Sequence, residues 1–222
     1  MADTKISSLT ALTGADTDTA ADVLAIVDTS VTTTKKMLVD ELAVALASTQ
    51  AEVNAMTSTN TLITPALNKI ILGTEVATTS GTAVDYTGFP AGVRRITIML
   101  GGVSLNGTTN LLIQLGDSGG FETSGYVSTA VDTGATAVTS TAGFLASAGA
   151  DASSAMRGTY VLNLEDSSDF TWVGSGTITR DVVMIMAAGV KSLSAELTQL
   201  RITTVNGTST FDSGVVNISY ER

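Results

Sequence analysis

Residues 73–222 contain many short runs in which apolar and polar side chains alternate. In one of these runs, Ile96, Ile98 and Leu100 occupy every second position, so they would share one face of a β-strand. Gly-rich loops separate the runs. Many short strands with Gly-rich turns are typical of a two-sheet sandwich or a jelly-roll, and about 150 residues suffice for one such domain. The pattern therefore predicts a mainly β protein that ends in a jelly-roll-like β-sandwich.

Several segments of this region are expected to be strands. They are residues 83–86, 94–100, 111–115, 126–131, 159–164, 171–178, 182–187, 199–205 and 215–220. Asn106-Gly107 and Asn206-Gly207 are tight-turn signals, because both residue types tolerate positive φ. Residues 177–180 are interpreted as a turn into the next strand. Residues 132–154, mostly Ala, Gly, Ser, Thr and Val, do not show where their elements lie.

The composition limits the classes of partner. Charged residues make up 14% and the net charge is −10, so nucleic acid and anionic membranes are unfavourable partners. Cys and His are absent, which removes disulfides, soft or imidazole metal ligands and the commonest general base. The mean hydropathy of +0.34 leaves few charges for a solvated surface. Either Ser and Thr cover much of the surface, or part of it is buried against other chains.

The first residues predict a cytoplasmic origin. Met1 to Lys5 are polar and no apolar signal region follows them. No apolar run reaches the roughly 18 residues that a membrane span needs. We therefore expect a chain that stays soluble in the cytoplasm unless it leaves inside a larger particle.

Residues 1–47 are expected to form a small hairpin followed by a helix. Residues 22–28 are an apolar run between aspartates, and 35–39 read as a returning strand. Asp40 and Glu41 suit the first turn of a helix over 40–47, because acidic side chains favour the positive end of its dipole.

This N-terminal unit resembles the N-terminal segment of many phage virion proteins, mostly tail-fibre-like. The resemblance rests on residues 5–15, 22–28, 34–36 and 39–42. It implies a segment that docks on a virion rather than a catalytic domain. The expected anchoring side chains are Ile6, Leu9, Leu12, Ile26, Leu38 and Leu42. The alternative is a generic β-hairpin with a capping helix.

Residues 48–72 are expected to be a connector. Residues 48–57 and 62–67 resemble the Ala-(Ser/Thr)-Gln-Ala-Glu…Thr-Pro-x-x-Leu segment of bacteriophage tail-fibre proteins, with Met56 where that family usually has Gly. The resemblance implies a position near a three-fold axis. The expected trimer contacts are Leu62, Ile63, Leu67 and Ile70. The alternative is a linker whose apolar end begins the next core.

The region 73–222 also resembles the β-sandwich modules at the C-terminal part of phage fibre proteins. The residues that carry this resemblance are 85–90, 92–97, 115–120 and 205–214.

Gly116-Asp117-Ser118-Gly119-Gly120 matches the nucleophile motif of chymotrypsin-like proteases, whose serine needs a histidine base that this chain lacks. A Ser–Lys dyad with Lys69 or Lys191 is formally open. We favour a Gly-rich turn after Leu115, in which Asp117 and Ser118 hydrogen-bond the local backbone.

Other candidate sites have plainer interpretations. Glu165, Asp166 and Asp169 could bind Ca²⁺, but a solvated turn is favoured because their spacing matches no EF-hand loop. A carboxylate pair for glycoside cleavage stays open from sequence alone. Five aromatic residues could form a sugar platform, although core packing is the favoured use of most: Tyr86, Phe89, Phe121, Tyr126 and Trp172. We assign no catalytic, cofactor-binding or metal-binding residue.

The resemblances imply a structural phage virion protein, and the lack of a catalytic side-chain set favours a non-enzymatic role. We expect a homotrimeric short fibre or fibre-like appendage, assembled in the host cytoplasm and anchored by residues 1–47 to other virion proteins of tail or capsid. A host surface glycan is a further candidate partner. The alternatives are a capsid decoration or cement protein and a host-glycan-binding module.

Overall fold

The computed structural model describes residues 23–28, 33–38, 70–134, 137–152 and 154–222. The chain divides into two units, Met1–Leu67 and Asn68–Arg222, and each is described by itself. In the first unit, β1 (Val23–Asp28) and β2 (Thr33–Leu38) form an antiparallel hairpin in which Val23 pairs with Leu38. The predicted hairpin is therefore confirmed, whereas the helix expected over 40–47 lies outside the described residues.

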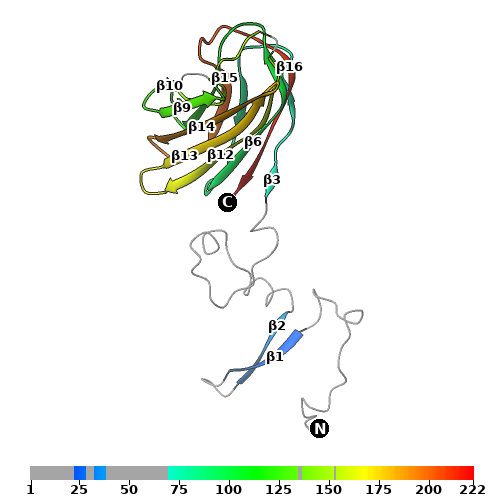
Figure 1. Ribbon diagram of the computed structural model, residues 1–222. Coiled ribbons are helices and arrows are strands. Elements are labelled where there is room, and N and C mark those ends of the chain that lie inside the picture. The colour runs from blue at the N-terminus through cyan, green and yellow to red at the C-terminus, as the bar shows by residue number, and fades with distance from the viewer. Residues whose placement is uncertain (1–22, 29–32, 39–69, 135–136, 153) are drawn as a thin grey trace. The chain divides into compact units, whose positions relative to one another are not determined.

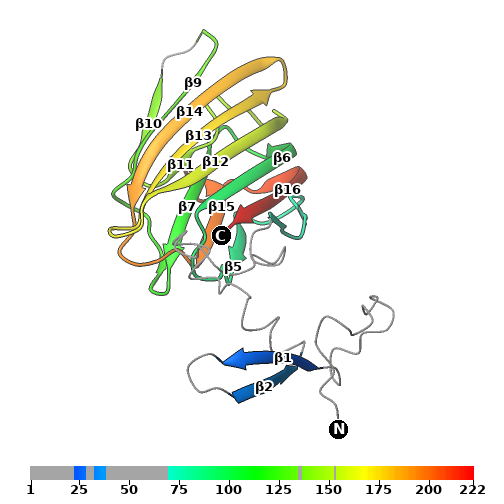
Figure 2. The same cartoon turned by 90° about the horizontal axis from the view of Figure 1, so that it is seen from below.

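The second unit is a sandwich of two antiparallel sheets (Figure 1). Figure 2 shows the larger sheet as a row that runs from β10 to β16 across a second layer containing β7, β15 and β5. The order of the larger, 9-stranded sheet is β10 (Val138–Ser140), β9 (Val127–Asp132), β14 (Val183–Ser192), β13 (Thr171–Arg180), β12 (Met156–Asp166), β6 (Arg95–Leu105), β16 (Phe211–Glu221) and β3 (Ile71–Leu72), with β4 (Val76–Ala77) also paired to β16. The 5-stranded sheet has the order β11 (Phe144–Leu145), β7 (Leu111–Asp117), β15 (Gln199–Thr204) and β5 (Val84–Thr87), with β8 (Gly120–Phe121) paired to β7.

The hydrophobic core lies between the two sheets. Strand β6 turns Ile96, Ile98 and Leu100 inward, as the alternation predicted. The larger sheet also buries Tyr160 and Leu162 from β12. The smaller sheet contributes Ile113, Leu115, Leu200 and Ile202 to the same cluster. Burial of this apolar surface is the main force that holds the sheets together.

All the segments expected to be strands are strands, although several are longer than expected. One boundary was wrong: residues 177–180 are not a turn but the last part of β13. The chain reverses instead at Asp181, where φ is 53°. The short strands β3, β4, β8, β10 and β11 were not anticipated, and β10 and β11 lie in the region where no element could be placed.

Both Asn-Gly pairs form loops that cross from one sheet to the other. The first joins β6 to β7 and the second joins β15 to β16, so neither closes a hairpin. Of the two glycines, Gly207 has positive φ, at 67°, and Gly107 does not. The two loops are joined, because the Asn106 N–H donates to the Thr210 carbonyl at 3.0 Å and the Thr210 N–H donates to Asn106 Oδ1 at 2.9 Å. Asn106 therefore fastens the β6–β7 loop to the β15–β16 loop.

Candidate interaction surface

The predicted anchoring and trimer-contact residues lie mostly outside the described part of the chain. Those outside are Ile6, Leu9, Leu12, Leu42, Leu62, Ile63 and Leu67. Ile26 and Leu38 belong to the paired strands β1 and β2. Ile70 is 67% exposed in the second unit. The roles assigned to these residues therefore stay predictions.

The Gly-Asp-Ser-Gly-Gly motif is the hairpin between β7 and β8. The Gly119 N–H donates to Asp117 Oδ1 at 2.7 Å, and Ser118 is exposed at the turn. The other Asp117 oxygen, Oδ2, accepts a hydrogen bond from the Ser194 hydroxyl at 2.6 Å. The Ser194 and Gly119 donors hold the pKa of the Asp117 carboxyl below its usual value. The predicted turn and the hydrogen bond between Asp117 and the local backbone are confirmed, although the strand continues to Asp117. The hydrogen bond expected for Ser118 stays a prediction.

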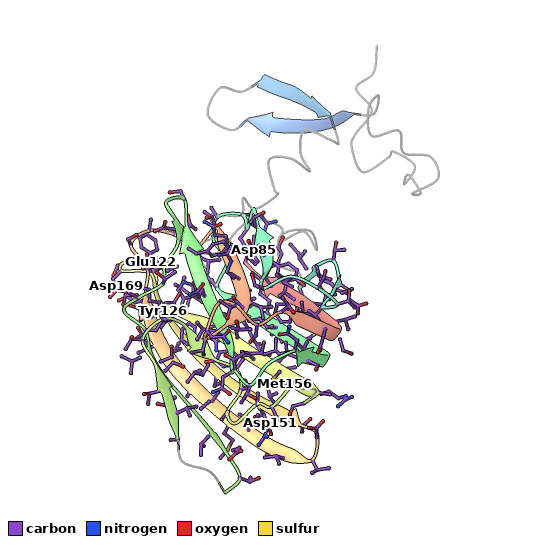
Figure 3. The ribbon with its side chains drawn as sticks, turned by 90° about the horizontal axis from the view of Figure 1, so that it is seen from above. Asp85, Glu122, Tyr126, Asp151, Met156 and Asp169 are labelled. Atoms are coloured by element: carbon purple, nitrogen blue, oxygen red, sulfur yellow. The ribbon has the colours of Figure 1, made fainter. Side chains whose placement is uncertain are left out.

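Lys191 is held beside this hairpin by Glu122. Its ammonium pairs with Glu122 Oε2 and lies 5.3 Å from the centre of the Tyr126 ring. Figure 3 labels Glu122 and Tyr126 at the same end of the sandwich, and the Tyr126 hydroxyl donates to the Glu122 carbonyl at 3.0 Å. Burial alone would raise the pKa of the Glu122 carboxyl, but the hydrogen bonds from Lys191 and Ser194 outweigh it and lower that pKa. The Glu122 side chain therefore links residues 191–194 to the loop that follows β8.

The candidate calcium residues form a turn. Asp166 Oδ1 accepts hydrogen bonds from the Ser168 N–H and hydroxyl, both at 2.7 Å, and these donors lower the pKa of the Asp166 carboxyl. Asp169 Oδ1 accepts from the Thr171 N–H at 3.1 Å. Both carboxylates thus shape the β12–β13 connection. Across the described ranges, no group of three acidic residues could hold a metal ion.

Several of the aromatic residues pack in the hydrophobic core. Trp172 and Tyr126 are fully buried, and Phe89 packs edge-on against Tyr220 with ring centres 5.3 Å apart. Core packing is therefore confirmed for these side chains. Tyr86 and Phe89 also line a recess of about 400 Å³ between β5, β16 and residues 73–76. Asp85 at its edge is bound by both Nε and Nη2 of Arg201 at 2.7 Å.

A further accessible feature is the outer face of the larger sheet. We define it as the side chains of β9, β14, β13, β12, β6 and β16 that point away from the core. Strand register places them in rows across the sheet. One central row is Thr129, Ala188, Ser175, Val161, Thr97 and Ser219. The next is Val131, Met186, Thr177, Thr159, Met99 and Asn217.

Neither central row carries a charge. Charges enter the outer face outside these two rows. Arg157 lies in the adjacent row, which also contains Met184 and Gly101, and Glu165 is exposed near the other end of β12. The pair Arg95–Glu221, whose charged atoms lie 3.6 Å apart, stands at the same end as Glu165. Five of the large hydrophobic residues that the second unit exposes belong to this face or to its β3 border: Leu72, Val127, Val173, Met184 and Met186. The face therefore combines small uncharged side chains with exposed apolar groups.

The outer face is not flat. On β14, Met184 and Met186 project with exposed fractions of 48% and 59%. On the opposite side of the face, β6 and β16 border a recess of about 330 Å³. Its lining comprises Leu72, Glu75, Met99, Leu100, Gly101, Val215 and Asn217. At Gly101 the Val215 side chain packs against the backbone, because a Cβ there would lie 2.8 Å from Val215 Cγ2.

Sequence reasoning did not find this face. The signal was present in β14, where Met184, Met186, Ala188 and Val190 alternate with buried residues. Because both faces of β14 carry apolar residues, the sequence alone does not show which of the two faces points away from the core.

No protein family, curated protein or solved structure matches this chain. Within the described residues, no helix is both long and apolar enough to cross a membrane.

Proposed function

We propose that this chain is a structural, non-enzymatic protein of a bacteriophage virion, a homotrimeric short fibre or fibre-like appendage. Residues 1–47 attach it to the particle, residues 48–72 run near the three-fold axis, and the β-sandwich projects outward. The observation that carries the assembly is the pair of uncharged central rows on the outer face of the larger sheet, in a chain whose net charge is −10. The phage assignment rests on the sequence resemblances.

The charge distribution explains why such a face favours self-association. Copies with a net charge of −10 repel one another wherever acidic surfaces approach. A contact through the central rows brings only neutral side chains together, so it avoids that repulsion and removes apolar surface from water. The hairpin β1–β2 also forms at residues that resemble virion-attachment segments, which supports the anchoring role.

A deletion of residues 1–47 tests the proposal. In a phage whose own copy of the gene is removed, we supply either the full chain or the truncated chain and analyse purified particles by mass spectrometry. The full chain enters the particles and the truncated chain does not, because its anchor is missing. Circular dichroism of the truncated protein serves as the folding control. Equal incorporation of both chains would contradict the anchoring role.

The second candidate function is recognition of a host glycan. The recess lined by Tyr86, Phe89 and Tyr220 favours it, because sugar rings pack on aromatic faces and the neighbouring Thr87 supplies a hydroxyl. Binding to a glycan array, lost in Tyr220→Ala, would support this function.

A capsid decoration or cement protein differs from a fibre in its place on the particle, which electron microscopy of labelled virions distinguishes.

A further inference from the structure

We infer that the outer face of the larger sheet is a contact between copies of this chain, in which the β14 methionines of one copy enter the Gly101 recess of the next. This inference rests on the proposed homotrimer and adds to it the surface through which the copies meet. Met184 and Met186 form the projecting side of the contact. Met99, Gly101 and Val215 form the receiving side, and the exposed Glu75 stands in the same lining.

The absence of charge at the centre of the face points to a buried partner. Soluble proteins usually carry charged residues at about a quarter to a third of their surface positions. Both central rows, from Thr129 to Ser219 and from Val131 to Asn217, have none. Because the chain is acidic overall, two identical copies repel each other unless they meet through neutral surfaces.

The size of the face fits a specific interface. Six neighbouring strands about 4.8 Å apart and two rows about 6.8 Å apart give the central rows an area of roughly 400 Å². A stable protein contact buries about 800 Å² on each partner. The central rows therefore supply about half of the area that one chain needs to contribute, and the flanking rows of the face supply the rest.

The two sides of the face complement each other in shape. Methionine side chains are flexible and fill irregular apolar gaps, so Met184 and Met186 suit the recess beside Gly101. The methionines lie on β14 and the recess on β6 and β16, with β13 and β12 between them. A separation of three strand spacings, about 14 Å, keeps the methionines and the recess of one copy apart.

The contact therefore joins unlike surfaces of successive copies. Contacts of this kind produce rings when the rotation between copies closes. Three sheets with their outer faces turned inward can enclose a three-fold axis as a triangular prism. In that arrangement, the β9–β14 side of each face meets the β6–β16 side of its neighbour.

The first test introduces a charge on the projecting side of the full-length chain. Met186→Glu places a carboxylate in the contact, whereas Val205→Glu is the matched control on the β15–β16 loop, where the exposed fraction of 53% is close to the 59% of Met186. By light scattering, the wild type and Val205→Glu have the mass of three chains and Met186→Glu has the mass of one. A three-chain mass for Met186→Glu would overturn the inferred contact and leave the proposed function standing.

The second test uses charge complementation. Met99→Lys alone also reduces the mass to that of one chain, because it places an ammonium in the recess. The double variant Met186→Glu/Met99→Lys regains the three-chain mass, since every contact then pairs a carboxylate with an ammonium. Circular dichroism of each variant monitors folding. A folded double variant that stays at single-chain mass would overturn the pairing of methionines with the recess.

Discussion

The Tyr86 hydroxyl donates a hydrogen bond to the Val216 carbonyl oxygen at 2.9 Å. This contact joins β5, at the edge of the smaller sheet, to β16 of the larger sheet. Burial, together with the negative charge of Glu75, raises the pKa of Tyr86 to about 12. The same side chain thus links the two layers and lines the aromatic recess.

Alkaline pH should weaken the sandwich through Tyr86. Its folded pKa of about 12 exceeds the ordinary value of 10.0, so its contribution to stability is complete below pH 10 and declines as pH rises towards 12. Tyr86→Phe removes both the hydrogen bond and this titration. We expect it to lower the free energy of unfolding by about 1 kcal/mol at pH 7 and to flatten the decline above pH 10. Urea unfolding at pH 7 to 11 measures both, and an unchanged alkaline slope would contradict the role of Tyr86.

Acid should weaken the β7–β8 hairpin through Asp117. Hydrogen bonds from Ser194 and Gly119 lower the pKa of its carboxyl below the ordinary 3.8, so the stabilisation is complete above that pH and is lost as pH falls further. Ser194→Ala removes the first donor. We expect this variant to lose less stability than the wild type between pH 5 and pH 2.5 in chemical denaturation. Parallel curves for both proteins would show that Ser194 does not set the Asp117 pKa.

Substitutions at two glycines allow the cost of positive φ to be measured apart from the cost of a steric clash. Gly214 has φ of 94°, and a Cβ there would lie 2.3 Å from the Gly102 carbonyl oxygen. Gly207 has φ of 67° with open space around its Cβ position. We expect Gly207→Ala to cost about 1 kcal/mol from positive φ alone, and Gly214→Ala to cost at least about 2 kcal/mol more. Equal losses in denaturant unfolding would show that the β6–β16 strands can move apart at Gly214.

The Lys191–Glu122 pair should show strong coupling. The Lys191 side chain is 7% exposed and that of Glu122 is 23% exposed. Removing Glu122 therefore leaves the more buried charge, the Lys191 ammonium, without its partner. We expect Glu122→Gln to lower the free energy of unfolding by about 3 kcal/mol and Lys191→Met by about 2 kcal/mol. The double variant should lose clearly less than the sum of the two. Additive losses in a double-mutant cycle would contradict a direct pairing.

The alternation of side chains carried most of the fold prediction. Residues such as Ile96, Ile98 and Leu100 repeat every second position because one side of each strand faces the core, and that constraint is local. Short strands such as β10 and β11 escaped prediction. Residues 138–140 and 144–145 are too few to show a period, and pairing with β9 and β7 defines them.

The errors concern relations between distant residues. Asn106-Gly107 was expected to be a tight turn with positive φ, but Gly107 has no positive φ, and its loop crosses between sheets and is fastened by Thr210 from another loop. The outer face was missed for the same reason. Met186 and Met99 come from distant parts of the sequence and meet in one row only through the register of four strands.

The solution mass of the full-length chain, measured by light scattering at physiological salt, tests the trimeric assembly most directly. We predict a mass near three times 22.6 kDa, because the uncharged central rows of the outer face and the connector are both expected to lie between copies. A single species of 22.6 kDa across the working concentration range would contradict the trimer.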